Sequence, residues 1–277
     1  MTAVNLRGAL QPALAGGYAV AGLVVLGWED AVAFTEAAEE TGCAVILQAG
    51  PGARRHTPIP VLGKMLRYLA EQARVPVVCH IDHAVTLDEC RAGIEHGFTS
   101  VMFDGSQLPI DQNIEMTQKV AAIARPAGVS VEGEVGYVGY AQGAASALTS
   151  PDEARLFDLH SGADALAVSV GNVHLQTQAS DGIDLAALRA IEAVTRLPLV
   201  LHGGSGIAAA ARRMLARQTR VCKFNIGTEL RMAFGAALRQ TLADHPAGFD
   251  RIALLAPAIP AMRRRAVDII RELRGAA

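Results

Sequence analysis

A regular alternation of short apolar runs with longer segments of helical period constrains the fold more than any other feature. Each short run is rich in β-branched residues and bounded by glycine or proline, and each longer segment repeats apolar residues at three and four positions. This alternation predicts parallel strands with helices outside them. Strands are expected over Tyr18 to Val25, Ala44 to Gln48, Val77 to Ile81, Ser100 to Phe103, Ser130 to Val135, Ala165 to Val170, Leu199 to Leu201 and Val221 to Asn225. These eight units favour an α/β fold closed into a single (β/α)8 TIM barrel, while periodicity alone leaves an open doubly wound sheet as the alternative.

Helices are expected between the strands and again after the last one. The internal helices are predicted over Glu29 to Thr41, Ile59 to Ala73, Leu87 to His96, Ile110 to Ala124, Pro151 to Ser161, Leu185 to Thr195 and Ala208 to Arg217. A long helix from Glu229 to Asp244 and an extra C-terminal helix from Pro257 to Arg274 follow the eighth strand. The last helix has three consecutive arginines beside an apolar set from Met262 to Leu273, so it is either a solvated amphipathic helix or a subunit contact.

Length and composition suit one globular enzyme domain. A chain of 277 residues is within the reach of one barrel, so we expect a single domain over residues 1–277. Hydrophobic residues make up 51% of the chain and the net charge is −2, which excludes a disordered chain and a basic nucleic-acid-binding surface. The expected partner is a small molecule, with no nucleic acid and no membrane.

Cysteine usage and the N-terminal segment bear on the compartment. The four cysteines form no C-x-x-C pair and mostly lie in apolar runs, so we interpret them as reduced core thiols of a cytoplasmic protein. The uncharged stretch from Gly8 to Trp28 loosely imitates a signal peptide. Gln11, Pro12 and the Gly16-Gly17 pair interrupt that stretch, and a barrel strand is expected after them, which favours the cytoplasmic interpretation.

Polar residues that end the apolar runs are the candidates for chemistry, because barrel enzymes place catalytic side chains at the carboxyl ends of strands. They are His80, Asp82, His83, Asp104, Glu132, Glu134, His174, His202, Lys223 and Asn225. A lone histidine at a strand end is more often structural than a metal ligand. Histidines on strands three, six and seven share one rim, however, and three neutral imidazoles with an open fourth position are typical of catalytic zinc.

Glycine-rich loops follow the seventh and eighth strands. One reads His202-Gly203-Gly204-Ser205-Gly206, and the other leads from Asn225 through Gly227 to Thr228 and into a helix. In barrels these loops commonly bind phosphate through backbone N–H groups and a helix N-terminus. The Gly-Gly-Ser-Gly sequence also makes an ordinary turn, so by itself it is weak evidence for a phosphate site. Its position next to His202, a candidate metal ligand, strengthens that interpretation.

Several stretches together carry a specific resemblance. They are "HIDHAVTLDECRAGIEHGFTSVMFDGSQLPIDQNIEMT", "VSVEGEVG", "ALAVSVGNVH", "LHGGSGI" and "KFNIGTELRMAF". In order and spacing the chain resembles class II fructose- and tagatose-bisphosphate aldolases over nearly its whole length. The resemblance implies a zinc-dependent aldolase, a lyase that reversibly cleaves a phosphorylated ketose to dihydroxyacetone phosphate and an aldehyde. It also implies a homodimer or homotetramer.

The resemblance also implies roles for individual residues. His83, His174 and His202 match the zinc ligands, with Asp104 and Glu134 as acidic residues of the metal site. Asp82 matches the residue that moves the proton of the hydroxyl at the cleaved carbon. His80 lies outside the ligand set and is taken as structural. The phosphate and the enediolate end of the donor half match Gly203, Ser205, Asn225 and Thr228. The implied cofactor is Zn2+ or another divalent metal, with a monovalent cation as an additional option.

The expected chemistry explains these residue types. Cleavage beside a ketone leaves a carbanion, and zinc bound to the carbonyl and adjacent hydroxyl oxygens delocalises that charge as an enediolate. No Schiff-base lysine is then required. Lys64, Lys119 and Lys223 are the only lysines, and Lys223, at the eighth strand, leaves imine formation as the contrary interpretation.

The chain departs from the family pattern around the substrate. Gln142 occupies the place of a mobile-loop glutamate that exchanges a proton, and an amide cannot act as that base. Glu132, Tyr137, Tyr140 or a water are the candidate replacements. Leu175 and Gly227 stand where the family has glycine and aspartate, and the loop after the second strand has Arg54, Arg55 and His56, which either grip an anion or are solvated.

Two other functions remain open from the sequence. One is a catalytically silent or altered-substrate barrel subunit that supports a partner aldolase. The loss of the loop glutamate favours this alternative, whereas the presence of Asp82 and the three histidines disfavours it. A metal-dependent hydrolase is disfavoured because the first strand has no His-x-His pair.

Overall fold

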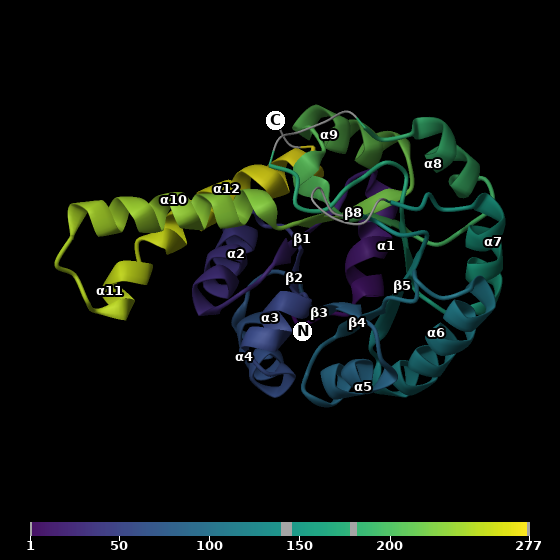
Figure 1. Cartoon of the computed structure of the whole chain (residues 1–277), viewed down its shortest axis with the longest axis horizontal. Coiled ribbons are helices and arrows are strands. Elements are labelled where there is room, and N and C mark those ends of the chain that lie inside the picture. The colour runs from purple at the N-terminus through teal and green to yellow at the C-terminus, as the bar shows by residue number, and fades with distance from the viewer. Residues whose placement is uncertain (1, 140–145, 178–181, 276–277) are drawn as a thin grey trace.

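Eight parallel strands form a closed barrel in sequence order, with helices around it (Figure 1). The computed structural model describes residues 2–139, 146–177 and 182–275. The strands are β1 (Val20–Val24), β2 (Val45–Ala49), β3 (Val77–Ala84), β4 (Ser100–Phe103), β5 (Ser130–Val135), β6 (Ala165–Val168), β7 (Leu199–Leu201) and β8 (Val221–Ile226). β8 pairs with β1, which confirms the predicted TIM barrel and excludes the open sheet.

Helices cover the outside of the barrel and extend beyond it. They are α1 (Leu6–Gly16), α2 (Trp28–Thr41), α3 (Pro51–His56), α4 (Ile59–Gln72), α5 (Leu87–Glu95), α6 (Ile110–Ala124), α7 (Pro151–His160), α8 (Leu185–Glu192), α9 (Ala209–Gln218), α10 (Thr228–Asp244), α11 (Arg251–Leu255) and α12 (Ala258–Arg274). The predicted helices lie within a few residues of these bounds. Sequence patterns missed α1, α3 and α11.

The uncharged N-terminal stretch forms α1 and β1 and belongs to the folded barrel. The Asn5 side chain caps the start of α1, and Gly17, with a φ of 62°, ends it. Leu6 and Leu10 are fully buried and pack into one cluster with Ile46, Val78, Met102, Val200 and other inward-facing strand residues. α1 therefore closes the end of the barrel interior from which the strands start.

The apolar face of α12 is satisfied within the chain. Met262, Ile269 and Leu273 are at most 1% exposed, and α12 packs mainly against α2 and α10. The apolar face from Met262 to Leu273 is therefore covered within the chain and does not need a partner, while assembly of the chain into an oligomer stays a prediction. Instead, α10, α11 and the start of α12 project from the barrel (Figure 1), and Phe249 is 94% exposed next to α11.

Two further observations concern the cysteines and the length of the helices. Cys79, Cys90 and Cys222 are buried thiols, as expected, and burial raises the pKa of each to about 12. Within the described ranges, no helix is long and apolar enough to cross a membrane.

Candidate metal centre and active site

Three imidazoles converge at the carboxyl rim of the barrel. His83 is the second-last residue of β3, His202 follows β7, and His174 lies in the segment after β6. Their ring centroids are 4.6 Å apart for His83 and His202, and 5.4 and 5.7 Å apart for the two pairs that include His174. One ligand atom from each ring lies within 4.8 Å of the other two, so the set can hold one metal ion.

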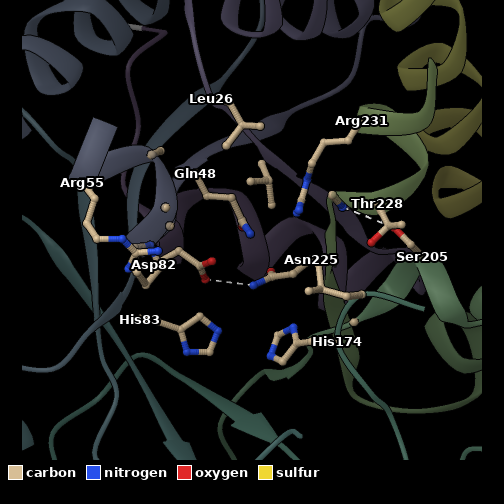
Figure 2. A pocket seen from close by; sticks show the side chains of 18 residues that line it. Leu26, Gln48, Arg55, Asp82, His83, His174, Ser205, Asn225, Thr228 and Arg231 are labelled. Carbon is tan, nitrogen blue, oxygen red and sulfur yellow. Dashed lines mark hydrogen bonds between the residues drawn. The ribbon is translucent and has the colours of Figure 1, made fainter. Parts of the chain in front are cut away.

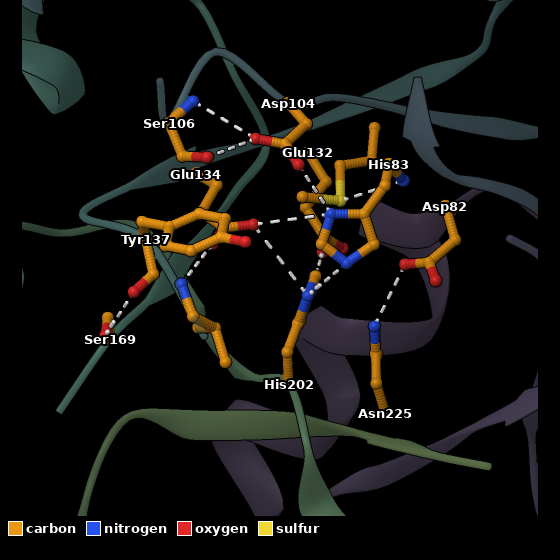
Figure 3. Close-up of polar contacts among 12 residues, drawn as sticks. Asp82, His83, Asp104, Ser106, Glu132, Glu134, Tyr137, Ser169, His202 and Asn225 are labelled. Atoms are coloured by element: carbon orange, nitrogen blue, oxygen red, sulfur yellow. Dashed lines mark hydrogen bonds and ion pairs between the residues drawn. The ribbon is translucent and has the colours of Figure 1, made fainter. Parts of the chain in front are cut away.

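His83 is held in an unusual backbone conformation that aims its ring at the site. Its φ is 53°, in the left-handed region that few non-glycine residues adopt, and the β3–β4 register shifts between Ile81 and Ala84. Nδ1 lies 2.7 Å from Asp104 Oδ2, which leaves Nε2 directed into the site (Figure 3). Burial disfavours the charged ring, but the nearby carboxylates, Asp82 first, outweigh burial and raise the pKa of His83 to about 10.

His202 presents its other nitrogen to the same place. Its Nδ1 lies 2.9 Å from His83 Nε2, and its Nε2 lies 3.2 Å from Glu132 Oε1. Burial and the neighbouring His83 lower the pKa of His202 well below its ordinary value. The ring is therefore neutral, with a lone pair available to a metal. Asn172 stabilises this position, because its amide donates to the His202 backbone oxygen at 3.0 Å.

Glu134 supplies a buried carboxylate oxygen that lacks a hydrogen-bond donor. Its Oε2 accepts no hydrogen bond from the described residues and lies 3.7 Å from His83 Nδ1 and 3.9 Å from His202 Nδ1. Burial, followed by the charge of Asp104, raises the pKa of Glu134 to about 8. A buried carboxyl oxygen with no hydrogen-bond partner among the described residues, beside His83 and His202, fits a divalent cation, because a bound cation would favour the ionised form of Glu134.

Asp104 differs from Glu134 in what its oxygens contact. Oδ1 accepts hydrogen bonds from Ser106, and Oδ2 binds His83 Nδ1 (Figure 3). Although Asp104, Glu134 and His83 also form a group that could hold a metal, this geometry favours Asp104 as the partner that orients His83.

Asp82 lies beside the histidines on the wall of the cavity. It is 6% exposed, and its Oδ1 accepts a hydrogen bond from Asn225 Nδ2 at 3.0 Å. Burial opposes ionisation, but nearby positive charge, that of His83 first and that of Lys223 with it, outweighs burial and lowers the pKa of Asp82. Asp82 is thus an ionised, oriented carboxylate that can accept a proton.

A cavity of about 320 Å³ opens beside these residues (Figure 2). On one side lie Gly203, Ser205, Thr228 and Arg231, at the N-terminus of the 17-residue helix α10. Ser205 Oγ accepts from the backbone N–H groups of Gly227 and Glu229, at 3.3 and 3.4 Å. The N-terminus of a long helix therefore faces this side, with Ser205 held against it, as expected for an anion site.

Close packing requires glycine at position 203 and favours it at position 227. Gly203 has a φ of 67°, and a Cβ there would lie 2.2 Å from the Val173 backbone oxygen. A Cβ at Gly227 would lie 2.5 Å from Arg231 Nη2. The departure to glycine at 227 therefore makes room for an arginine at the cavity.

The two arginines after β2 have different environments. Arg54 is held by three backbone oxygens. Its Nη1 donates to the backbone oxygens of Ala49, at 2.7 Å, and of Asp82, and its Nη2 donates to the backbone oxygen of His83 at 2.9 Å. Arg55 lines the cavity opposite Ser205 and Thr228 (Figure 2) and forms no ion pair with the residues that the structure describes. Arg54 is thus a structural clamp, and Arg55 is available to a ligand.

Gln48 and Arg231 are cavity residues that the sequence interpretation missed. Gln48 ends the second apolar run, so the strand-end rule could have found it. It is fully buried, and both amide atoms lack a hydrogen-bond partner among the described residues. Arg231 lies one helical turn after Thr228, a spacing that places both on one side of α10.

Other predicted candidates lie elsewhere. Gln142 and Tyr140 fall outside the described residues. Lys223 is fully buried, with Nζ 2.6 Å from Glu132 Oε2, and it does not line the cavity, so this geometry gives no support to imine formation. His80 and Glu132 are also fully buried, with His80 Nδ1 2.9 Å from Ser100 Oγ.

Comparisons with known proteins agree on one family. The family model described as "Fructose-bisphosphate aldolase class-II" matches residues 4–277. A fructose-bisphosphate aldolase of Geobacillus stearothermophilus is 34% identical over 280 residues, covering 98% of this chain and 97% of that protein. A 6-phospho-5-dehydro-2-deoxy-D-gluconate aldolase of Bacillus licheniformis is 35% identical over 280 residues, covering 98% and 95%. The crystal structure of the YdjI aldolase from Escherichia coli K12 matches with a TM-score of 0.86 and 28% identity, covering 98% and 97%.

Proposed function

The chain belongs to the class-II fructose-bisphosphate aldolase family and is an aldolase, and on that premise we propose that it uses zinc to cleave a phosphorylated ketose reversibly. The products are dihydroxyacetone phosphate and an aldehyde. The observation that carries the proposal is the meeting of three imidazoles, an orphaned carboxylate oxygen and an ionised aspartate at one cavity.

His83, His174 and His202 would hold the zinc ion, with Glu134 as an additional oxygen ligand. Bound there, zinc supplies a Lewis acid that polarises the ketone and stabilises negative charge beside it. Asp104 orients the His83 ring through its contact with Nδ1. The same residues would accept another divalent metal with similar ligand preferences.

Asp82 is the proposed proton-transfer residue. In the cleavage direction, its ionised carboxylate accepts the proton of the hydroxyl at the carbon that becomes the aldehyde. In the condensation direction, it returns that proton. Asn225 orients the carboxylate, since its amide donates to Asp82 Oδ1 at 3.0 Å.

The donor phosphate is proposed to bind on the side of the cavity formed by Gly203, Ser205, Asn225 and Thr228. Backbone N–H groups at the start of α10 favour an anion there. Arg231, which lines the same side, adds a positive charge. With the phosphate bound there, we expect the reacting carbons of the ketose to lie between the phosphate and Asp82.

Arg55 favours a second class of substrate for the same reaction. In these substrates the part that becomes the aldehyde carries an acidic group. It lies across the cavity from the donor-phosphate side (Figure 2). A guanidinium binds carboxylate or phosphate through paired N–H donors. We therefore include phosphorylated sugar acids beside ketose bisphosphates as candidate substrates, a choice supported by the similarity to a 6-phospho-5-dehydro-2-deoxy-D-gluconate aldolase.

The projecting α10–α11 region is proposed as the surface through which a homodimer or homotetramer forms. Phe249 and Ile252 are 94% and 78% exposed there. Light scattering at micromolar concentration checks this assembly, and a monomer at that concentration would contradict it. Residues 1–277 are taken as one domain.

An aldol-addition screen tests the proposed reaction. Purified protein is incubated with dihydroxyacetone phosphate and a panel of neutral, phosphorylated and carboxylated aldehydes, and new sugar phosphates are identified by mass spectrometry. We expect carbon–carbon bond formation with at least one aldehyde, abolished by Asp82→Asn. Product formation that is equal with Asp82→Asn and wild-type protein would contradict the assigned chemistry.

A further inference from the structure

A buried polar cluster lies one layer deeper in the barrel than the metal centre. Its members come from four strands: His80 from β3, Ser100 from β4, Glu132 from β5 and Lys223 from β8. All four are fully buried. A lysine and a glutamate are costly to bury, so their contacts require a reason.

Lys223 links the two acceptors of this cluster. Its Nζ lies 2.6 Å from Glu132 Oε2 and 3.3 Å from His80 Nε2. Because an ammonium can only donate, His80 Nε2 is an acceptor, and the His80 hydrogen resides on Nδ1, which donates to Ser100 Oγ at 2.9 Å. The ammonium and the carboxylate are thereby fixed relative to each other.

The second oxygen of Glu132 reaches a proposed metal ligand. Oε1 lies 3.2 Å from His202 Nε2 (Figure 3). An ionised carboxylate only accepts hydrogen bonds, so His202 Nε2 must carry the hydrogen and donate it. The lone pair of the neutral ring is then on Nδ1, the nitrogen that lies 2.9 Å from His83 Nε2.

His83 shows the opposite choice of nitrogen. Asp104 binds Nδ1 of His83 at 2.7 Å and leaves Nε2 for the metal, whereas Glu132 binds Nε2 of His202 and leaves Nδ1. Two carboxylates on different strands thus select different nitrogens in two neighbouring rings.

We propose that Lys223 and Glu132 are positioning residues that hold His202 as its Nε2–H tautomer and thereby set the zinc affinity of the site. Lys223 anchors one oxygen of Glu132, and the other oxygen anchors the imidazole. This inference rests on the proposed zinc site, but the tautomer of His202 is measurable in the metal-free protein without any activity.

Glu132→Gln is the sharpest variant because Lys223 can only donate. The carbonyl oxygen of the new amide must turn toward Lys223, which leaves its NH2 group facing His202 and favours the Nδ1–H tautomer. We expect zinc affinity, measured by competition with a chromophoric chelator, to fall by about 10- to 100-fold. Nitrogen-15 NMR of the histidines in the metal-free protein should show His202 changing from Nε2–H to Nδ1–H.

The double variant Lys223→Met/Glu132→Gln separates positioning from folding. Without the ammonium, the amide can turn its carbonyl oxygen back to His202, so Nε2–H and part of the zinc affinity should return. This variant also leaves no buried charge at the two positions, so it supplies a folded comparison if Glu132→Gln alone does not fold. Wild-type zinc affinity with an unchanged tautomer in Glu132→Gln would overturn the proposal. If that variant does not fold, a double variant in which His202 carries its hydrogen on Nδ1 and zinc affinity is still that of the wild type overturns it instead.

Asp164→Asn is the matched control. Asp164 accepts a hydrogen bond from Val131 N at 2.8 Å and pairs with Arg7, away from the metal centre. Its substitution should lower the unfolding temperature without changing zinc affinity. Equal loss of zinc affinity in Asp164→Asn and Glu132→Gln would show that general destabilisation is the cause and would refute the positioning role. A wild-type chain that binds no zinc would instead contradict the proposed function, whatever the His202 tautomer.

Discussion

The two halves of the barrel's carboxyl rim are built differently. On the β3–β7 half, His83, Asp104, Glu134 and His202 stand at or just beyond strand ends and are held by side-chain contacts of 2.7 to 3.9 Å. On the half formed by β1, β2 and β8, Arg55 and Arg231 reach the cavity from helices and lack such clamps. On the proposed function, we expect the first half, which we call the chemical half, to carry out the reaction, and the second half, which we call the selective half, to select the substrate.

The largest expected effect comes from removing two ligands of the chemical half. His174→Ala combined with His202→Ala should reduce bound zinc from one equivalent per chain to none and abolish cleavage, because one imidazole cannot retain the ion. Metal analysis after exhaustive dialysis measures the content. A double variant that still retains one equivalent would break the assignment of these ligands.

Asp82→Asn should reduce cleavage by about 100- to 10,000-fold while zinc and fold are retained, since the amide cannot accept the proton. Although burial opposes ionisation, nearby positive charge, that of His83 first, holds the pKa of Asp82 below the usual range of a carboxyl group, so protonation of Asp82 reduces wild-type activity only at pH below that range. Steady-state kinetics together with zinc analysis provides the check. Near-normal turnover by this variant would show that Asp82 is not the proton-transfer residue.

Arg55→Met should act on specificity alone. We expect kcat/KM for aldehydes with a carboxylate or phosphate end to fall about tenfold, as for loss of one charge-assisted hydrogen bond, with neutral aldehydes unaffected. Arg125→Met, at an exposed arginine outside the cavity, is the control. Equal losses for charged and neutral aldehydes would mean that Arg55 supports the fold instead of the acceptor.

Gly227→Ala should give the smallest effect. The new Cβ would lie 2.5 Å from Arg231 Nη2, so the flexible guanidinium is expected to move away from the cavity. An exposed ionic contact contributes about 1 kcal/mol or less, which corresponds to a rise in the KM for the phosphorylated substrate of about fivefold at most. Arg231→Met should show a similar rise, and adding Gly227→Ala to it should change little. If the two substitutions raised KM independently and additively, Gly227→Ala would not act through Arg231, and the explanation would be wrong.

The sequence predicts the chemical half better than the selective half for a physical reason. Strand ends follow from an apolar run and its first polar residue, so the amino-acid sequence alone places Asp82, Glu134 and His202 at one rim. Arg54 and Arg55 are adjacent and chemically identical, and only the helical turn of α3 decides which one faces the cavity. The left-handed conformation of His83 also has no signature in its side chain.

Sequence patterns missed α1 and α3 because the local signals in these segments do not indicate a helix. Pro12 and the Gly16-Gly17 pair indicated an interruption, yet Pro12 lies inside α1 and Gly17 provides its left-handed end. The pattern from Pro51 to His56 is too short to show helical period. In both places, tertiary packing against the barrel decides the local structure.

The central claim is that three histidines hold a zinc ion on which carbon–carbon cleavage depends, and a zinc titration of metal-free protein tests it most directly. Bound zinc and the rate of dihydroxyacetone phosphate release are followed together, and the cleavage substrate is the sugar phosphate formed from the best aldehyde in the screen. We predict that the rate rises in proportion to bound zinc, reaches a plateau at one equivalent per chain and stays at background in the His174→Ala/His202→Ala variant. Full cleavage by protein freed of metal, or a rate independent of bound zinc, would contradict the account.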